Sequence, residues 1–316
     1  MARFGKSAPD ILVWLILLGA PFWLPAVGSY VELGTHIVVL ALAAMALNFL
    51  LGFTGVLSFG HAAYFGLGAY GTALTIKYLY PSTPVGMLVG IVTGTAAAAV
   101  IGLMIVRLRG VYFAMCTIAF GQVFYFIAFQ RFSLTGGDDG VSAWHRIPLD
   151  LGFTTIDILN NNKALYYFVL AVFAVSVGLM AFLLRSPFGR TLIAIRENER
   201  RARFLGIPVD AHIWMSWVVS CFFVSVAGTL FALMNDFIDP RAIRWDQSGT
   251  FVIMAVLGGM RNFWGPLIGA AIYIALQDYL SSHTENWMSF IGLFFVLIVL
   301  FFPRGVLGII RRKAVS

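Results

Sequence analysis

Residues 31–51 read VELGTHIVVLALAAMALNFLL, an almost unbroken apolar run with a single carboxylate, Glu32, near its start. About 20 such residues in a helix cross the roughly 30 Å hydrocarbon core of a bilayer, so this run predicts a membrane-spanning helix. Similar apolar runs occur near residues 11–28, 61–80, 84–107, 111–132, 164–184, 213–234, 248–260, 264–280 and 287–303. The chain is therefore predicted to be an all-α, polytopic integral membrane protein with about ten transmembrane helices, some of them short or broken, in one domain over 1–316.

The composition excludes a soluble protein. Of the 316 residues 60% are hydrophobic and 11% are charged, with a mean hydropathy of +0.89, whereas a soluble domain carries about 25% charged residues. The two cysteines, Cys116 and Cys221, are too few for a disulfide framework or a cysteine-based metal cluster. The sequence contains no H-E-x-x-H, no G-x-S-x-G and no metal-spaced His/Cys cluster, so we expect no enzyme active site, no metal and no cofactor bound by this chain.

Two of the predicted segments are irregular. The run 248–260 is short, and the glycine-rich stretch from Gly52 to Gly60 separates two longer runs. Half-helices or re-entrant pieces of this kind survive at membrane depth only where protein or a cavity covers their backbone, which leaves the count at about nine to eleven spans.

The distribution of Lys and Arg predicts the orientation, because cytoplasmic loops of membrane proteins collect cations. With ten spans and an internal N-terminus, the inner side holds fifteen of the 21 cations and four of the 14 acids, a net charge of +11 against −4 outside. Both termini are therefore predicted to be cytoplasmic, with 133–163 as a periplasmic loop and 185–212 as a cytoplasmic segment. The basic balance reflects topology, and we expect no nucleic-acid partner.

Small residues recur every four positions in the predicted helix 84–107. This ridge consists of Gly86, Gly90, Gly94, Ala98 and Gly102. Gly265 and Gly269 repeat the spacing near the other end of the chain. Small side chains at this spacing let helix backbones approach closely, so we expect both ridges to pack against other helices of a compact bundle.

The inner segment 185–212 contains a predicted helix over 187–205. Ser186-Pro187 is a good N-cap followed by proline at the first helical position. Gly206-Ile207-Pro208 is a stop signal.

The predicted helix is amphipathic. At 100° per residue its apolar side chains share one arc, and the arginines lie outside it; the arc consists of Phe188, Leu192, Ile195 and Ala202. Glu199 falls within the arc, where its carboxylate needs a partner, either Arg203 four residues on or a cation of another protein. The residues alone leave two interpretations open, a helix on the membrane surface with its arginines on lipid phosphates and a helix that docks on a partner.

The outer loop contains the turn-rich stretch Leu134-Thr135-Gly136-Gly137-Asp138-Asp139-Gly140 and is either a docking surface or an exposed connector. Polar side chains at membrane depth are sparse, and each is a candidate for function. Among them His61 is either a residue that hydrogen-bonds between helices or a ligand, and the first interpretation is the commoner one.

Short motifs run through most of the chain in a fixed order. They are Asn48-Phe49-Leu50-Leu51-Gly52, Leu57-Ser58-Phe59-Gly60-His61, Leu134-Thr135-Gly136-Gly137, Ala194-Ile195-Arg196-Glu197-Asn198-Glu199, Val256-Leu257-Gly258-Gly259-Met260, Gly265-Pro266-Leu267-Ile268-Gly269-Ala270 and Phe302-Pro303-Arg304-Gly305. Together they resemble the permease subunits of branched-chain amino-acid ABC importers, the LivM-type half of a heterodimeric permease.

This resemblance implies a multi-pass permease subunit, embedded in lipid in the bacterial inner (cytoplasmic) membrane. The implied partners are a homologous second permease subunit, two ABC ATPase subunits that bind ATP and Mg²⁺, and a periplasmic substrate-binding protein. The implied solutes are leucine, isoleucine and valine, with urea, short amides or another small metabolite as the alternative on the same scaffold. An ion-coupled secondary transporter and a membrane-embedded enzyme are the competing classes.

The resemblance also points to three groups of site residues. The inner helix resembles the coupling helices that rest in a groove of an ABC ATPase, with Leu192, Ile195, Arg196, Glu197, Glu199, Ala202 and Gly206 as coupling residues. Candidates for the translocation path are Asn48, Ser58, Gly60, His61, Gly258 and Gly259. Candidates for docking of the binding protein are Thr135, Gly136, Gly137, Asp138 and Asp139.

Overall fold

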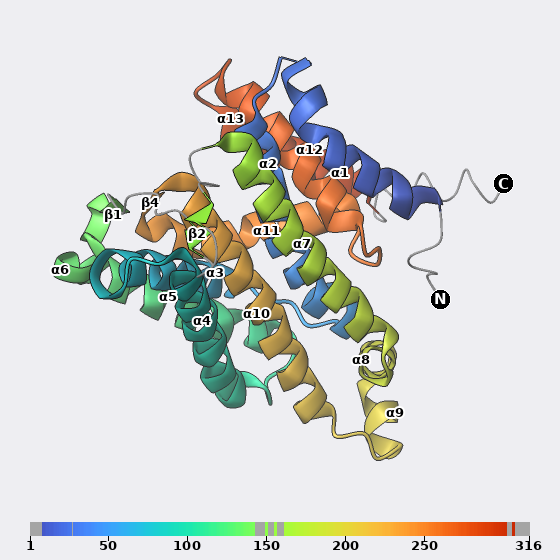
Figure 1. The fold of residues 1–316 in the computed structure, drawn as a ribbon. Coiled ribbons are helices and arrows are strands. Elements are labelled where there is room, and N and C mark those ends of the chain that lie inside the picture. The colour runs from blue at the N-terminus through green and yellow to red at the C-terminus, as the bar shows by residue number, and fades with distance from the viewer. Residues whose placement is uncertain are drawn as a thin grey trace.

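Each apolar run of the sequence forms a helix in the computed structural model, which describes residues 8–26, 28–142, 149–150, 155–156, 161–301 and 305–306. The ten helices are α1 (Ala8–Ala26), α2 (Val31–Asn48), α3 (His61–Leu74), α4 (Thr83–Ile105), α5 (Val111–Gln130), α7 (Asn162–Arg185), α10 (Val209–Asn235), α11 (Trp245–Gly258), α12 (Gly265–Ser281) and α13 (Trp287–Phe301) (Figure 1). The predicted all-α architecture is therefore confirmed. The terminal cations, the outer residues Trp144–Pro148 and the motif residues Phe302–Arg304 lie outside the described residues.

Shorter elements complete the described fold. They are the helices α6 (Phe132–Thr135), α8 (Pro187–Glu197) and α9 (Glu199–Phe204), the π-helices η1 (Phe49–Thr54) and η2 (Thr75–Leu79), the 3-10 helices η3 (Gly137–Asp139) and η4 (Pro240–Ile243), and the strands β1 (Val141–Ser142), β2 (Leu149–Asp150), β3 (Thr155–Ile156) and β4 (Phe237–Ile238). β1 pairs antiparallel with β4, and β2 with β3.

The helices differ in their ability to cross a bilayer. Five described segments are long and apolar enough to cross a bilayer, namely Val31–Thr54, Thr83–Ile105, Val111–Gln130, Asn162–Arg185 and Val209–Asn235. The other five are shorter; α11, for example, has 14 residues and extends about 21 Å at 1.5 Å per residue. The bundle thus combines full-length spans with short pieces, as the irregular runs of the sequence predict.

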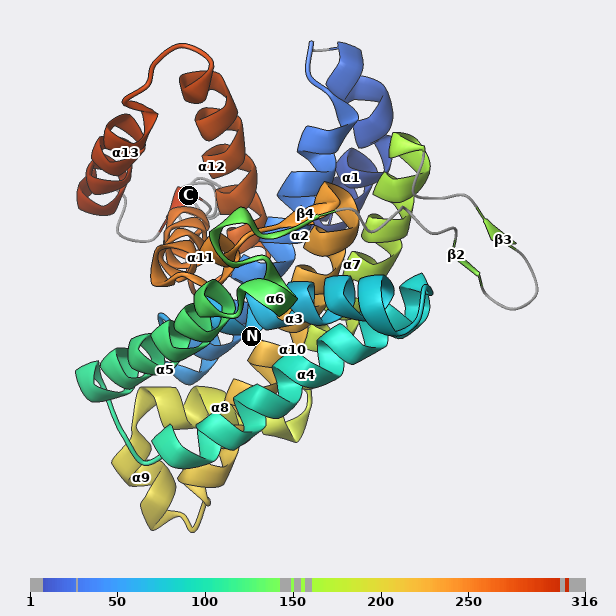
Figure 2. The same cartoon turned by 90° about the vertical axis from the view of Figure 1, so that its left-hand side faces the viewer.

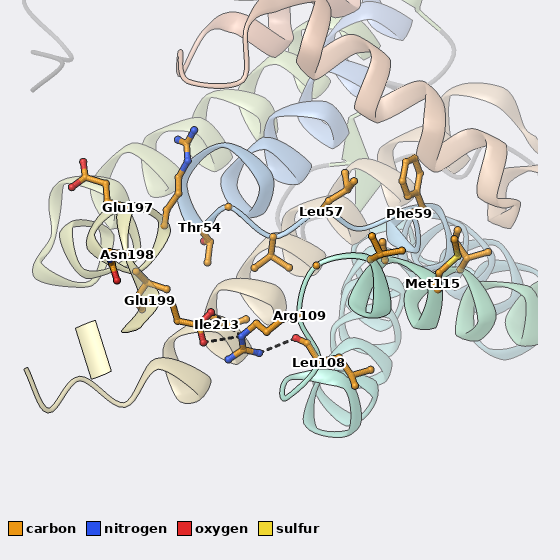
Figure 3. A pocket seen from close by; sticks show the side chains of 18 residues that line it. Thr54, Leu57, Phe59, Leu108, Arg109, Met115, Glu197, Asn198, Glu199 and Ile213 are labelled. Atoms are coloured by element: carbon orange, nitrogen blue, oxygen red, sulfur yellow. Dashed lines mark hydrogen bonds and ion pairs between the residues drawn. The ribbon is translucent and has the colours of Figure 1, made fainter. Parts of the chain in front are cut away.

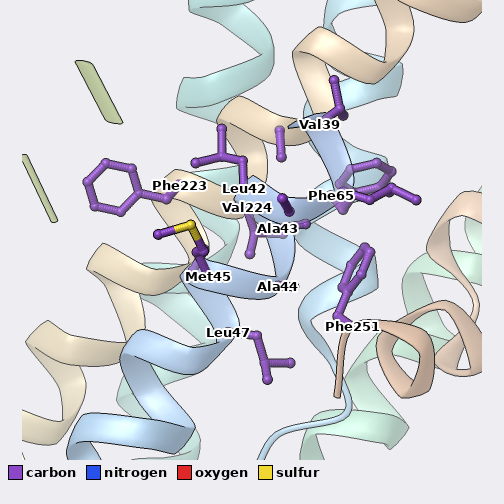
Figure 4. Packing of buried hydrophobic residues seen from close by; sticks show 14 of the residues in the cluster. Val39, Leu42, Ala43, Ala44, Met45, Leu47, Phe65, Phe223, Val224 and Phe251 are labelled. Carbon is purple, nitrogen blue, oxygen red and sulfur yellow. The ribbon is translucent and has the colours of Figure 1, made fainter. Parts of the chain in front are cut away.

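Helix α2 lies at the centre of the bundle. Every residue from Val38 to Leu50 is buried, and its side chains meet Phe65 of α3, Phe223 of α10 and Phe251 of α11 (Figure 4). A helix that is apolar on all sides is expected at such a central position. Because lipid is as apolar as these side chains, close packing has to hold the helices together.

The small-residue ridge of α4 supplies such packing. All five of its members are buried, and α4 lies against α3 and α10. A Cβ added at Gly90 would lie 2.4 Å from the Gly68 carbonyl oxygen, and one at Gly94 would lie 2.2 Å from Ser225 Oγ. The predicted packing role of the ridge is confirmed.

The chain leaves helical geometry between η1 and α3. Gly55 has φ +84°, a value that favours glycine, and residues 55–60 are irregular. Side chains of two other helices, α5 and α11, satisfy the backbone here: Phe59 N donates to Thr117 Oγ1 at 3.2 Å, and Ala62 N donates to Ser248 Oγ at 2.8 Å. Protein covers the break, which is the condition for irregular backbone at membrane depth.

Hydrogen bonds between the ends of helices connect residues that the predicted alternation of spans places on the same side of the membrane. At the end of the bundle that carries β1 and β4, Tyr30 donates to Asp278 at 2.7 Å and Asn162 donates to Glu32 at 2.8 Å. At the other end, which carries α8 and α9, Trp264 donates to Asp10 at 2.8 Å. Figures 1 and 2 show these two ends, called the β1 end and the α8 end below.

Candidate functional site

The α8 end holds a pair of short helices rather than one. Helix α8 begins at Pro187 after Ser186 and ends at Glu197. Asn198 then adopts an extended conformation, φ −158° and ψ 97°, and its side chain accepts a hydrogen bond from Arg201 N at 2.8 Å as the N-cap of α9. The predicted single helix 187–205 is therefore wrong, because the Asn198 side chain bonds the backbone better as a cap than within a helix.

Helix α9 stops where the sequence predicts. Gly206 has φ +79°, Gly206 N donates to the Arg203 carbonyl at 3.0 Å, and Ile207 N donates to the Ala202 carbonyl at 3.2 Å. Such a glycine terminator satisfies the last carbonyls of a helix. Gly206 is exposed with no atom within 4 Å of an added Cβ.

The apolar arc of this segment packs on the chain itself. Leu192 is 0% exposed, and Ile195 and Ala202 are 3% exposed; the latter two pack with Val209 and Ile213 of α10. These three residues therefore cannot fill a groove of another protein, and the predicted choice of docking face is corrected. The apolar face of this amphipathic segment is therefore the face that packs against the bundle.

The opposite face of α8 is free. Ile193, Ala194 and Glu197 are exposed, Ile193 to 39%. We call these three residues the outer face of α8. A helix that presents an apolar side chain and a carboxylate while its other side is fixed is suited to contact a second protein.

Glu199 is the centre of an ion-pair network beside α8. Arg109, in the turn between α4 and α5, donates from Nε to both Glu199 oxygens at 2.9 and 3.0 Å. Arg203 donates from Nη2 to Glu199 at 2.9 Å and to Asp210 at 2.8 Å, and Arg109 also pairs with Asp210. The four charges tie the α4–α5 turn to α9 and to the first turn of α10.

The network orients these elements more than it stabilises them. The four side chains are between 31% and 49% exposed, so water screens their attraction. Partial burial acts to raise the pKa of the Glu199 carboxyl, but hydrogen bonds from Arg109 and Arg203 outweigh it and hold that pKa below its usual range. The predicted pairing with Arg203 is confirmed, whereas Arg109, 90 residues away in sequence, gave no local signal.

A cavity of about 580 Å³ opens between this network and the break after η1. Leu57 and Phe59 line it from the break, Met115 from α5, and Arg109 and Glu199 from the network (Figure 3). Its wall is mostly apolar and its rim is charged. Among the described residues no group of three or more His, Cys, Asp or Glu side chains is placed to hold a metal ion.

Arg196 points into the chain. Its Nη1 donates to the carbonyl oxygen of Gly52 in η1, and its Cγ lies 2.9 Å from where a Cβ of Gly55 would be. Burial and the nearby Arg261 lower the pKa of the Arg196 guanidinium. A residue predicted to face an ATPase thus binds the interrupted helix of its own chain.

The candidates for the translocation path gather around the break and the α11–α12 turn. Ser58 and His61 are 1% and 0% exposed, and His61 hydrogen-bonds Ser58 Oγ at 3.0 Å and Ser220 Oγ at 2.8 Å. His61 therefore bonds between helices α3 and α10. Sequence analysis missed Ser220, although it follows Ser216 at one helical turn, and Ser216 in turn bonds Thr54 at 2.6 Å.

The other path candidates are also enclosed. Asn48 is 1% exposed, and Gly60, Gly258 and Gly259 are buried. A Cβ at Gly258 would lie 1.7 Å from the Gly265 carbonyl oxygen, and Gly259 has φ +109°. In this conformation the six candidates pack within the chain, and contact with a solute in the assembled transporter stays a prediction.

The docking candidates of the outer loop form a compact turn at the β1 end. Thr135 is buried and donates to the Arg131 carbonyl at 2.8 Å, while Gly136 and Gly137 have φ of +71° and +60°. Asp138 and Asp139 are exposed. The glycines therefore shape a turn that presents two carboxylates, and their use by a binding protein stays a prediction.

Residues 29–300 match the model of a protein family described as the branched-chain amino acid transport system / permease component. The chain belongs to this family. It is 25% identical to the high-affinity branched-chain amino acid transport system permease protein LivM of Escherichia coli, over 96% of this chain and 75% of that protein. It is 28% identical to the corresponding LivH protein of E. coli, over 85% of this chain and 91% of that protein.

Relatives extend beyond bacteria. The probable branched-chain amino acid transport permease protein LivM of Methanocaldococcus jannaschii is 23% identical over 84% of this chain and 89% of its own length. No solved structure matches the chain. Family membership thus rests on sequence over nearly the whole chain, and the ordered motifs of the sequence are consistent with it.

Proposed function

We propose that this chain is the transmembrane permease subunit of an ATP-driven ABC importer that translocates leucine, isoleucine and valine. The similarity to LivM and LivH proteins over most of the chain supports this function and this solute class. The same pair of names supports a second, homologous permease subunit as the direct partner. The chain performs no covalent chemistry, and ATP with Mg²⁺ is bound and hydrolysed by two partner ATPase subunits.

The observation that carries the ATP-driven class is the geometry of α8. Its apolar face is fixed on the bundle while its outer face stays free, so force applied to that face reaches the transmembrane helices. A helix on the membrane surface would instead turn its apolar face to lipid. The outer face of α8 is therefore the ATPase contact in this proposal, and the acidic turn at Asp138–Asp139 is the contact of the periplasmic binding protein.

The charge bias supports one orientation in the membrane. The α8 end collects Arg109, Arg196 and Arg203 together with other arginines that are exposed, and such an excess of cations supports a position on the cytoplasmic side of a bacterial inner membrane. Both termini are then cytoplasmic, and the β1 end faces the periplasm.

The test is co-purification of the tagged chain, followed by reconstitution of the complex in vesicles. We expect a second permease and ATPase chains in the complex and ATP-dependent uptake of radiolabelled leucine into the compartment on the α8 side. Uptake driven by an ion gradient without any ATPase chain would refute the ABC class. ATP-dependent uptake of urea or a short amide in place of leucine would refute the solute assignment alone.

A further inference from the structure

The end of the interrupted helix α2–η1 is held by a residue of another element. Helical hydrogen bonding stops at the end of η1, where Gly55 N and Val56 N both donate to the Leu50 carbonyl, at 3.1 and 3.4 Å. The Gly52 carbonyl instead accepts from Arg196 Nη1 of α8. A guanidinium at a helix C-terminus satisfies a carbonyl left without a partner and interacts favourably with the negative end of the helix dipole.

Gly52 is confined on its other side by the turn between α11 and α12. A Cβ at Gly52 would lie 2.2 Å from the Met260 carbonyl oxygen and 2.3 Å from Asn48 Oδ1. Asn48 Nδ2 donates to the Asn262 carbonyl of the same turn at 3.3 Å. The backbone of η1 is thus in direct contact with the α11–α12 turn, with no room for either to slide past the other.

Asn48 carries an unusual polar atom. Its Oδ1 is buried and has no hydrogen-bond partner among the residues that the structure describes, although burial of an unpaired acceptor destabilises a fold. Native proteins contain few such atoms, and each requires an explanation. Asn48 sits where α2 passes into the π-helix η1, and single turns of π-helix within α-helices are frequent at functional sites.

We propose that Arg196 and Asn48 are positioning residues of one mechanical linkage, which runs from α8 through the Gly52 carbonyl to the α11–α12 turn. The inference rests on the proposed function, in which an ATPase moves α8. Arg196 transfers that movement to η1, and the contact of Gly52 and Asn48 with the backbone of Met260 and Asn262 transfers it to α11 and α12.

The linkage assigns roles that differ from those inferred from the sequence. Arg196 acts inside the chain instead of on the ATPase surface. Asn48 acts between two helical segments instead of on the solute. The ion pairs around Glu199 join other elements, the α4–α5 turn, α9 and α10, and their side chains are between 31% and 49% exposed, so they do not substitute for this route.

The first test uses the complete reconstituted importer and measures leucine uptake and ATP hydrolysis in the same vesicles. R196Q removes the charged donor. We expect uptake per ATP hydrolysed to fall about tenfold, because the loss of one hydrogen bond to a charged group corresponds to about that factor in an equilibrium constant. R196K keeps a donor and a positive charge and should restore part of the coupling. R107Q is the matched control, because Arg107 is an exposed arginine of the α4–α5 turn at the same end, and it should couple like the wild type.

The second test follows the α11–α12 turn directly and does not depend on R196Q folding well. In a complex that is otherwise wild type, a cysteine introduced by R261C should change its labelling rate between ATP-bound and nucleotide-free states. In R261C combined with N48A that change should disappear while assembly and thermal unfolding stay close to those of the R261C complex.

The outcomes separate the linkage from the proposed function. Failure of the wild-type complex to couple ATP to uptake would refute the proposed function itself. A wild-type complex that couples, with R196Q coupling equally well, would refute the role of Arg196. A nucleotide-dependent labelling change that persists in the N48A background would refute the role of Asn48.

Discussion

Addition of one methyl group to Gly90 should separate two helices that the structure holds in backbone contact. The new Cβ would lie 2.4 Å from the Gly68 carbonyl oxygen, 2.4 Å from Thr72 Oγ1 and 2.9 Å from Thr229 Cγ2. Real Cβ atoms essentially never approach closer than 3.0 Å. Gly90→Ala therefore requires α4 to move by about 0.6 Å from α3, since the first obstacle is backbone that cannot rotate away.

The size of the effect follows from two opposing contributions. Alanine in a helix is more favourable than glycine by about 0.5–1 kcal/mol, whereas overpacking a tight contact typically costs about 1–3 kcal/mol. Gly178 in α7 provides the matched control, because it is exposed and, apart from its chain neighbours and the nearby backbone of α7, no described atom lies within 4 Å of an added Cβ. We expect Gly178→Ala to be neutral or slightly stabilising and Gly90→Ala to be less stable than this control by about 1–3 kcal/mol.

The measurement is thermal unfolding of the purified protein in one detergent, with yield from the membrane as a second readout. Gly90→Leu should lower both readouts further, since the larger side chain also overlaps Thr229 of α10. If Gly90→Ala unfolds at the same temperature as Gly178→Ala, α4 does not contact α3 along its ridge and the packing argument fails.

Three further predictions concern the α8 end and the topology. Leu192→Asp should abolish folded protein, because it buries an unpaired charge, whereas Ile193→Asp should fold and assemble but lose substrate-stimulated ATP hydrolysis; equal behaviour of the two variants would contradict the assignment of faces. The Glu199 carboxyl has a lowered pKa, so its ion pairs stabilise the protein fully above its unfolded pKa of about 4.3 and progressively less as the pH falls below it; unfolding temperatures between pH 3 and 7 should show a larger loss in the wild type than in Glu199→Gln, in which Asp210 still pairs with both arginines. Cysteines introduced at Asp139 and Arg201 should differ in labelling by an impermeant thiol reagent on intact cells, and labelling of Arg201→Cys alone would reverse the orientation.

The sequence predicts the helices well because the bilayer leaves few alternatives. Apolar runs of sufficient length must form helices to satisfy their backbone, and all ten runs do so. The glycine spacing in α4 predicts its contact face for a similar reason, since close approach of two helix backbones requires small residues. Even the break after η1 is predicted by the sequence, because the glycines from Gly52 to Gly60 lie outside both flanking apolar runs.

The segment 185–212 shows which information a helical projection of the sequence does not contain. The projection finds the apolar arc of Leu192 and Ile195 correctly, but an apolar face packs equally well on its own bundle or on a partner, and only the position of α10 decides between them. Asn198 gave a local signal that the projection ignored, because asparagine is among the best N-cap residues. Arg109 gave none, and Asn48 stands out in the sequence only as a path candidate without its contact to Asn262, because the partners of these two residues lie 90 and 214 residues away.

The kinds of contact found at different places in the bundle imply how it can move. Gly228 and Gly269 let backbones cross so closely that an added Cβ would lie 1.9 Å from the carbonyl oxygens of Phe65 and Met254, respectively. Contacts of that kind do not deform gradually, so α3 with α10, and α11 with α12, should each move as rigid groups. Within residues 55–60, by contrast, Phe59 N and Gly60 N are bonded through hydroxyl side chains, those of Thr117 and Ser58, and a hydroxyl can exchange partners by rotating. A rotation of one group against the other is therefore expected to bend the chain at this segment, directly beside the carbonyl that Arg196 holds.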